Sequence, residues 1–333
     1  MSARRVRLML GAVWLAAAHP AAAQLPAGLV ERAITVPGPV PLPGTLTLPA
    51  GPGPFPGLII VHGSGAGDRD LTMGPLPPLS EIKPYRDLAW GLARLGVAVL
   101  RYDKRPRVAP MWFANKPFTV FDESVDDAVS ALALLRQQPE VQAARTFMIG
   151  HSLGGMVAPR IAQADRKLAG IILMAGATRV RLVEQVERQL AYIQSVSGPD
   201  SLAVQAQRKQ LQPLLDRIRA LSPADSANTQ ILLGAPARYY LDLAQYDPAR
   251  AMRELSQPLL VLQGLRDYQV PPDQLDDWLS VLGSRPDLTV KRYEGLNHLF
   301  LRGEGPPSPA DYSRPGQVEP KVIADIAEWI SKH

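Results

Sequence analysis

The stretch Gly150-His151-Ser152-Leu153-Gly154-Gly155 decides the fold of this 333-residue chain. It contains the pattern G-x-S-x-G, which is a weak signal alone. Here it follows the predicted strand 146–149 and precedes a segment with helical periodicity that begins near Met156. A strand, a sharp turn and a helix in this order form the context of a nucleophile elbow, whose strained serine stands at the top of a sheet. We therefore predict Ser152 as a nucleophile, and the alternative is a glycine-rich turn with a capping serine.

Short apolar runs on both sides of the elbow predict the strands of one sheet. Runs that are apolar on both faces are typical of parallel strands buried between helices. Segments with helical periodicity alternate with them, and this alternation predicts an α/β fold with a mostly parallel, doubly wound sheet and right-handed crossovers. The runs are 57–61, 97–100, 147–149, 171–174, 259–262 and 288–290. The helical segments are 84–95, 124–135, 156–164, 274–282 and 318–330.

One interval of the chain breaks the alternation of strands and helices. Between 174 and 259 no apolar strand run occurs, and two helix-forming segments, 183–193 and 202–221, fill the space. We predict that residues 179–256 form a helical cap insertion over the carboxyl edge of the sheet, where the sites of α/β proteins lie. A solvated structural helix pair is the alternative.

The prediction divides the remaining chain into two parts of one core, 24–178 and 257–333. The first part carries the elbow and the second follows the insertion. At the start of the first part, two alternating runs, 33–36 and 45–48, predict an N-terminal hairpin. Proline residues should keep its strands short.

The composition excludes several protein classes. With 46% hydrophobic and 20% charged residues, the chain is close to globular averages, which excludes disorder and coiled coil as the main account. The absence of cysteine excludes disulfide scaffolds, thiol nucleophiles and zinc-thiolate sites. No run of 20 apolar residues occurs, so we predict no membrane-spanning helix.

Residues 1–23 have the pattern of a cleavable secretory signal peptide. Arg4, Arg5 and Arg7 precede the apolar stretch 8–18, and an A-x-A site stands before Gln24. An N-terminal anchor helix is the alternative. Cleavage would leave 33 basic and 31 acidic residues, a balance that requires no nucleic-acid partner. We therefore expect a periplasmic or secreted protein without stable membrane insertion.

A nucleophilic serine needs a base to accept its proton, and elimination among five histidines indicates His298. It follows the strand run around Val290 and comes after Ser152 in the chain, as this kind of triad requires. A merely solvated loop histidine is the alternative. The other four are His19 in the predicted signal peptide, His333 at the C-terminus, His151 inside the elbow and His62 in the loop after the first core strand.

The base in turn needs an acid that fixes its tautomer. Asp267 directly follows the strand run 259–262 and precedes His298 by 31 positions. Three rival aspartates follow Pro271-Pro272, where a helix should begin and where an aspartate more often serves the first helical turn. The rivals are Asp273, Asp276 and Asp277.

Acyl transfer also needs hydrogen-bond donors for the developing oxyanion. The backbone N–H of Leu153, which follows the nucleophile, is the first candidate. The second is expected in the loop His62-Gly63-Ser64-Gly65 after the first core strand, and we assign it to Ser64, with Gly65 as the alternative.

Three motifs together resemble a known family. The stretch 62–105 contains Gly67-Asp68-Arg69-Asp70 and Arg101-Tyr102-Asp103-Lys104-Arg105, and the elbow follows. This chain resembles the EstD-type bacterial carboxylesterases of the α/β-hydrolase superfamily and, more distantly, serine aminopeptidases and prolyl-oligopeptidase-like hydrolases. The resemblance extends over nearly everything after the signal peptide. It implies the α/β-hydrolase fold and serine carboxylesterase activity on short acyl esters, without a cofactor or metal.

Charged and aromatic residues around these motifs have expected supporting roles. Asp103 lies among basic residues and precedes the elbow, the wrong order for the catalytic acid. We predict that it forms a structural ion pair, and a catalytic role is the alternative. Residues 68–70 are expected to fix the oxyanion loop. The loops 71–83 and 108–118 are expected near the site, and candidates for an acyl pocket are Met111, Trp112, Phe113 and Phe118, with a purely structural core as the alternative.

We therefore expect an exported serine hydrolase that cleaves small-molecule carboxylic esters through an acyl-enzyme. A peptidase on the same fold is the runner-up, because Glu184 and Glu187 could hold a peptide chain. A catalytically silent binding module is the alternative from another class. The sequence makes no prediction about the oligomeric state.

Overall fold

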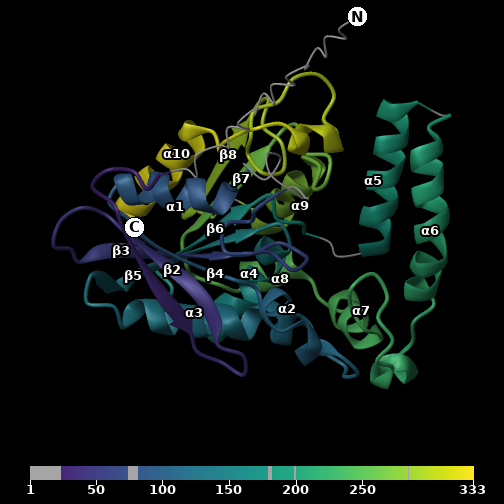
Figure 1. Cartoon of the computed structure of the whole chain (residues 1–333), viewed down its shortest axis with the longest axis horizontal. Coiled ribbons are helices and arrows are strands. Elements are labelled where there is room, and N and C mark those ends of the chain that lie inside the picture. Colours follow the sequence, from purple (N-terminus) through teal and green to yellow (C-terminus); the bar gives the residue numbers. More distant parts are fainter. Residues whose placement is uncertain (1–23, 74–81, 179–181, 199, 284) are drawn as a thin grey trace, which may run out of the picture.

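A single sheet forms the centre of the molecule (Figure 1). In a computed structural model, the described residues are 24–73, 82–178, 182–198, 200–283 and 285–333. The strand order is β1-β2-β4-β3-β5-β6-β7-β8. Strands β3 to β8 pair in parallel, whereas β2 pairs antiparallel with both β1 and β4. The strands are β1 (Val30–Val36), β2 (Leu42–Leu48), β3 (Phe55–Val61), β4 (Ala98–Tyr102), β5 (Val141–His151), β6 (Gly170–Met174), β7 (Leu259–Gly264) and β8 (Leu288–Tyr293).

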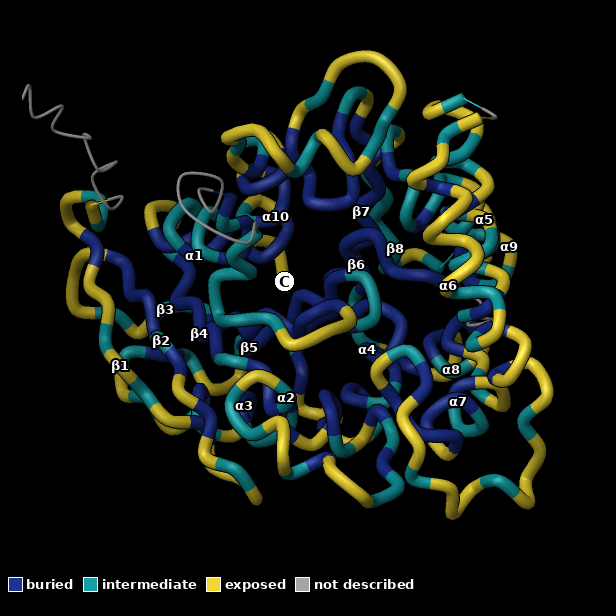
Figure 2. Tube along the Cα trace, turned by 45° about the vertical axis from the view of Figure 1, so that its right-hand side comes forward, coloured by how far each residue is buried: buried dark blue, intermediate teal, exposed yellow. Residues whose placement is uncertain are grey.

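The central strands are buried on both faces because helices cover each side. In β3, Leu58 and Ile60 pack into one apolar cluster, and Ile59 and Val61 pack into the other. Successive side chains of a strand point to opposite faces, so a run without polar residues supplies both clusters at once. Figure 2 shows these strands as dark blue, buried trace.

The helices form two layers and one outlying pair (Figure 1). Helices α1 and α10 pack together and cover one face, whereas α3, α4 and α9 contribute buried residues to the cluster on the other. The helices are α1 (Pro84–Arg94), α2 (Arg105–Val108), α3 (Asp126–Arg136), α4 (Leu153–Ala164), α5 (Leu182–Ser197), α6 (Leu202–Arg219), α7 (Ala237–Ala244), α8 (Pro248–Arg253), α9 (Asp273–Leu282) and α10 (Pro320–Lys332). Short turns of helix are η2 (Pro110–Phe113), η3 (Phe121–Val125), η4 (Pro223–Ala227) and η5 (Pro309–Ser313).

The chain between β6 and β7 carries four of these helices. Helices α5 and α6 pack along one another and stand apart from the two layers, and much of α6 is exposed (Figures 1 and 2). Helix α8 instead packs against α4 and α9. The segment 179–256 therefore contains an outlying helix pair and a final helix that lies on the sheet's own helical layer.

The predicted α/β architecture with a mostly parallel sheet is confirmed. The N-terminal hairpin is also present, and its strands are longer than predicted because β1 and β2 pair over seven positions. Through β2 the hairpin extends the sheet itself, which the sequence did not indicate. The predicted signal peptide, 1–23, lies outside the described residues. Among the helices that the structure describes, none is long and apolar enough to cross a membrane.

Candidate active site

Ser152 occupies a sharp turn between β5 and α4. Its backbone has φ of 55° and ψ of −118°, a left-handed conformation that costs energy for any residue other than glycine. The turn is possible because its neighbours are glycines: a Cβ on Gly150 would lie 2.5 Å from the Gly154 carbonyl oxygen. A hydrogen bond from the Ser152 N–H to the Met174 carbonyl (3.0 Å) fixes the turn to β6. This is the geometry of a nucleophile elbow.

His298 and Asp267 form a buried pair. The His298 Nδ1 lies 2.7 Å from Asp267 Oδ2, and the two side chains are 6% and 0% exposed. The other carboxylate oxygen of Asp267 accepts hydrogen bonds from the backbone N–H groups of Gln269 (2.8 Å) and Val270 (2.9 Å). The carboxylate therefore has a fixed orientation, and it selects the tautomer in which His298 carries its proton on Nδ1 and leaves Nε2 free as a base.

The structure separates Asp267 from its three rivals. Asp273 pairs with Arg188 and Asp276 with Arg292, and both aspartate side chains are more than half exposed. Asp277 accepts a hydrogen bond from the Thr178 hydroxyl (3.4 Å). Among the described residues, Asp267 is the only one of these four aspartates that bonds to His298.

A chain of buried polar groups connects the base to the elbow. The Nε2–H of His151 donates to the His298 carbonyl (2.9 Å), and the Tyr85 hydroxyl donates to His151 Nδ1 (3.0 Å). The same hydroxyl accepts the backbone N–H of Gly63 (3.2 Å). His298, Ser152 and the loop after β3 are thus held in one arrangement by side chains beneath the site.

His62 and His151 are unsuitable as bases. Burial lowers the pKa of His62 to about 4, with the Lys104 charge contributing, and lowers the pKa of His151 to about 3, with His298 contributing. Both remain neutral near pH 7 because removal from water disfavours the imidazolium. His62 Nε2 donates to the Tyr102 carbonyl (2.8 Å). The sequence argument against both residues agrees with these environments.

The predicted oxyanion donors lie around Ser152. Ser64, Leu153 and Ser152 all line one cavity of about 740 Å³. The N–H of Gly63 is engaged by Tyr85. Within the part of the chain that the structure describes, no acceptor bonds the N–H of Ser64 or of Leu153.

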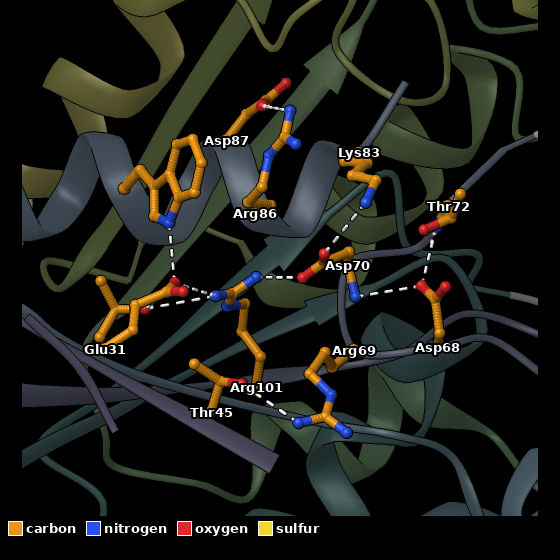
Figure 3. A network of polar contacts seen from close by, with 12 residues as sticks. Glu31, Thr45, Asp68, Arg69, Asp70, Thr72, Lys83, Arg86, Asp87 and Arg101 are labelled. Atoms are coloured by element: carbon orange, nitrogen blue, oxygen red, sulfur yellow. Dashed lines mark hydrogen bonds and ion pairs between the residues drawn. The ribbon is translucent and has the colours of Figure 1, made fainter. Parts of the chain in front are cut away.

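A polar network fixes the loop after β3 (Figure 3). Arg101 contacts both Glu31 and Asp70, and Asp68 Oδ1 accepts the N–H groups of Asp70 (3.1 Å) and Thr72 (2.8 Å). Residues 68–70 therefore stabilise the loop, as the sequence predicted.

Asp103 is structural. It accepts the backbone N–H (2.8 Å), Nε (2.9 Å) and Nη2 (2.8 Å) of Arg69. The predicted structural ion pair is confirmed, and its partner is Arg69 of the loop after β3.

Two predicted acyl-pocket residues line the cavity and two do not. Phe113 and Phe118 line it and pack edge to face, with ring centroids 4.6 Å apart. Met111 is 79% exposed, and Trp112 stacks on the Arg105 guanidinium at 4.6 Å. A four-residue helical turn points successive side chains in different directions, which explains the split.

Comparisons with known proteins agree with this geometry. A family model described as serine aminopeptidase, S33, matches residues 80–305, a range that contains the elbow, Asp267 and His298. The chain is also 37% identical over 307 residues to "Esterase EstD" of Thermotoga maritima. This alignment covers 92% of this chain and 69% of that protein. The chain belongs to the serine aminopeptidase S33 family.

Solved structures place this family member on the α/β-hydrolase fold. An esterase from the archaeon Pyrobaculum calidifontis has a TM-score of 0.56 and 19% identity, covering 91% of this chain and 85% of that chain. A hypothetical protein from Pseudomonas aeruginosa has a TM-score of 0.57 and 16% identity, covering 99% and 100%. The predicted fold class is confirmed.

The glutamates considered for a peptidase lie on α5 of this S33 family member. Glu184 lines a smaller cavity of about 190 Å³, which shares Gln185 with the cavity at Ser152. Glu187 pairs with the half-exposed Arg219 of α6 at 2.7 Å. Of the two, only Glu184 lines either of these cavities.

The sequence missed a second polar cluster at the wall of the 740 Å³ cavity. Glu123 and Tyr239 line it, and Glu123 forms a buried ion pair with Lys104. One signal was available: Lys104 follows β4 at the carboxyl edge of the sheet, where site residues gather.

Proposed function

We propose that this S33 family member is an exported serine esterase that hydrolyses short-acyl carboxylic esters through an acyl-enzyme on Ser152. The observation that carries the proposal is the fixed His298–Asp267 pair, with its Nδ1 to Oδ2 distance of 2.7 Å, connected by His151 to the strained elbow. A buried acid–base pair, together with a strained serine that lines a largely apolar cavity, supports acyl transfer.

The reaction begins when Ser152 Oγ attacks the ester carbonyl carbon and His298 Nε2 accepts the hydroxyl proton. The carbonyl oxygen becomes an oxyanion that accepts hydrogen bonds from the N–H groups of Leu153 and Ser64. Asp267 stabilises the imidazolium without taking its proton. When the tetrahedral intermediate collapses, the C–O bond to the alcohol breaks and His298 donates its proton to the leaving alkoxide.

Deacylation repeats these steps with water as the nucleophile. His298 Nε2 takes a proton from water, the hydroxide attacks the acyl carbon, and the new oxyanion occupies the same donors. The carboxylic acid leaves when the bond to Ser152 Oγ breaks and His298 returns the proton to the serine. The chain's own residues perform every proton transfer.

The similarity to an esterase supports the reaction class, and an ester panel tests the acyl length. We expect both the acyl and the alcohol group to lie in the cavity of about 740 Å³ that Ser152 lines. Purified protein should hydrolyse p-nitrophenyl acetate and butyrate with a higher kcat/KM than the laurate. Ser152→Ala should fold and lose this turnover by several orders of magnitude. Unchanged turnover in the variant would exclude Ser152 as the nucleophile, whereas a wild-type protein that hydrolyses none of these esters would favour a binding module.

A peptidase activity is tested in the same panel. An aminoacyl-p-nitroanilide that is cleaved faster than the esters would replace the esterase proposal, with Glu184 as the first group to examine at the substrate's amine. The supporting observation is its position in the cavity next to that of Ser152.

Export is the remaining part of the proposal, and it rests on the pattern of residues 1–23. N-terminal sequencing of the protein from a periplasmic or culture fraction should give a chain that begins at Gln24. A cytoplasmic protein with an uncleaved N-terminus would contradict it.

A further inference from the structure

Two side chains hold the backbone at Gly63 in the loop beside the nucleophile. The Gly63 N–H donates to the Tyr85 hydroxyl (3.2 Å), and Lys104 Nζ donates to the Gly63 carbonyl oxygen (2.9 Å). Gly63 also lies directly against Ser152, because a Cβ added to it would be 3.1 Å from the serine Cβ. The loop therefore has little freedom at the point nearest the nucleophile.

The Gly63 carbonyl and the Ser64 N–H belong to the same peptide unit. A trans peptide is planar, so its carbonyl and N–H point in opposite directions. By fixing the Gly63 carbonyl, Lys104 also fixes the direction of the Ser64 N–H. The positive charge of the Lys104 ammonium next to the Gly63 carbonyl oxygen polarises this peptide unit. The Ser64 N–H thereby becomes a stronger hydrogen-bond donor.

Lys104 is part of a buried cluster that reaches the cavity. Its side chain is 3% exposed and its ammonium contacts Glu123 Oε1, whose side chain is 9% exposed. The other oxygen of Glu123 accepts the hydroxyl of Tyr239 (2.6 Å), a residue of α7. Glu123 and Tyr239 both line the cavity that contains Ser152. The cluster thus connects the loop peptide to the cavity wall contributed by α7.

Stability alone does not account for such a cluster. Replacing a buried ion pair by apolar residues of similar volume is often neutral or stabilising. The neighbouring pair Arg105–Asp127 is equally buried and makes no bond to the loop at Gly63. Lys104 differs from Arg105 in its bond to the carbonyl oxygen of the peptide unit whose N–H is the predicted oxyanion donor.

We propose that Lys104 is a positioning residue that orients and polarises the Ser64 N–H toward the oxyanion, and that Glu123 and Tyr239 hold Lys104 in place from the cavity wall. The inference rests on the proposed function, because it assigns the Ser64 N–H a role in acyl transfer. No proton is transferred through the cluster. Its effect is electrostatic and appears only when negative charge develops on the substrate oxygen.

The test replaces the whole pair so that no buried charge is left without its partner. Lys104→Met/Glu123→Gln removes both charges and keeps an acceptor for Tyr239. Arg105→Met/Asp127→Asn is the matched control, because it removes a buried pair of the same segment that does not touch Gly63. Each variant is assayed with p-nitrophenyl butyrate and with a trifluoromethyl ketone, whose adduct with Ser152 carries an oxyanion.

Removal of one oxyanion donor costs about 10²–10³-fold in kcat, so a misdirected donor should cost at least about ten-fold. We expect that loss in the Lys104/Glu123 variant, with KM within about three-fold and the trifluoromethyl ketone Ki rising in proportion to the loss of kcat/KM. Lys104→Arg, which restores a cationic donor, should recover part of the kcat. The control pair should lose thermal stability to a similar extent without these changes.

Two results would overturn the inference: an unchanged kcat and Ki in the Lys104/Glu123 variant, or the same losses in the control pair. If the double variant does not fold, Tyr239→Phe replaces it, and kcat and Ki should again change in proportion; unchanged values would overturn the inference. Wild-type protein that shows no fluorophosphonate adduct on Ser152 would instead contradict the proposed function. The two failures are therefore distinguishable.

Discussion

In the proposed triad, Asp267→Asn removes the acid and keeps a side chain of nearly the same shape. In the native site, Oδ1 of Asp267 accepts two backbone N–H groups, from Gln269 (2.8 Å) and Val270 (2.9 Å), and Oδ2 faces His298 Nδ1 at 2.7 Å. The asparagine oxygen must stay with the two backbone donors, because its NH₂ group would meet them donor against donor. The NH₂ group therefore turns toward His298.

This orientation reverses the tautomer of His298. Facing a donor, Nδ1 must become the acceptor, and the imidazole proton moves to Nε2, where it blocks acceptance of the Ser152 proton. The expected loss of kcat is about 10⁴-fold, which corresponds to about 5.4 kcal/mol of transition-state stabilisation. KM should change little, because no substrate contact is lost.

The assay is steady-state hydrolysis of p-nitrophenyl butyrate together with thermal unfolding. Asp103→Asn is the matched control: it weakens the three bonds to Arg69 and should lower Tm while leaving most of the turnover. If Asp267→Asn lost less than ten-fold in kcat, or if Asp103→Asn lost 10⁴-fold, the assignment of the acid would be refuted.

Three further predictions concern the elbow, the cavity and buried histidines. Gly154→Ala should lower the free energy of unfolding, measured by urea titration, by roughly 1–3 kcal/mol, because the new Cβ would clash with the backbone carbonyls of Val61 and His62. Equal stability would show that the turn tolerates a side chain. Val186→Trp on α5 should narrow the cavity and so lower the ratio of kcat/KM for the laurate ester to kcat/KM for the acetate ester. Val196→Trp, at an exposed position of the same helix, should leave this ratio unchanged. Equal effects of the two substitutions would place the substrate elsewhere. The depressed pKa values of His62 (about 4) and His151 (about 3) mean that the native state binds fewer protons than the unfolded state below pH 6.5. Stability should be complete above pH 6.5 and fall toward pH 4 by about 1.4 kcal/mol per pH unit for each histidine, and a flat profile would contradict their burial as neutral groups.

Much of the fold could be predicted because its signals are local. The run 57–61 is apolar at every position, and it became part of strand β3, where its side chains are buried on both faces of the sheet. The elbow was equally local, since its glycines and serine occupy six consecutive positions. The antiparallel attachment of β2 to β4 was not predictable, because it depends on pairing between segments more than fifty residues apart.

The site residues that sequence reasoning missed act through tertiary contacts. His298 and Asp267 could be proposed from the sequence because triads have a required order and few candidates remained. Tyr85 and Glu123 carry no local signal, since their importance comes from Gly63, His151 and Lys104, which only the fold brings to them. The partner of Asp103 could not be predicted for the same reason: its sequence neighbours are basic, yet Arg69 in another loop faces it.

The central claim, that Ser152 is the nucleophile of a triad with His298 and Asp267, is tested most directly by fluorophosphonate labelling followed by peptide mapping. The wild-type chain should carry a single phosphonyl adduct on Ser152. Labelling should disappear in Ser152→Ala and slow by several orders of magnitude in His298→Ala. An adduct on Ser64 or another serine, or undiminished labelling of the Ser152→Ala variant, would contradict the account.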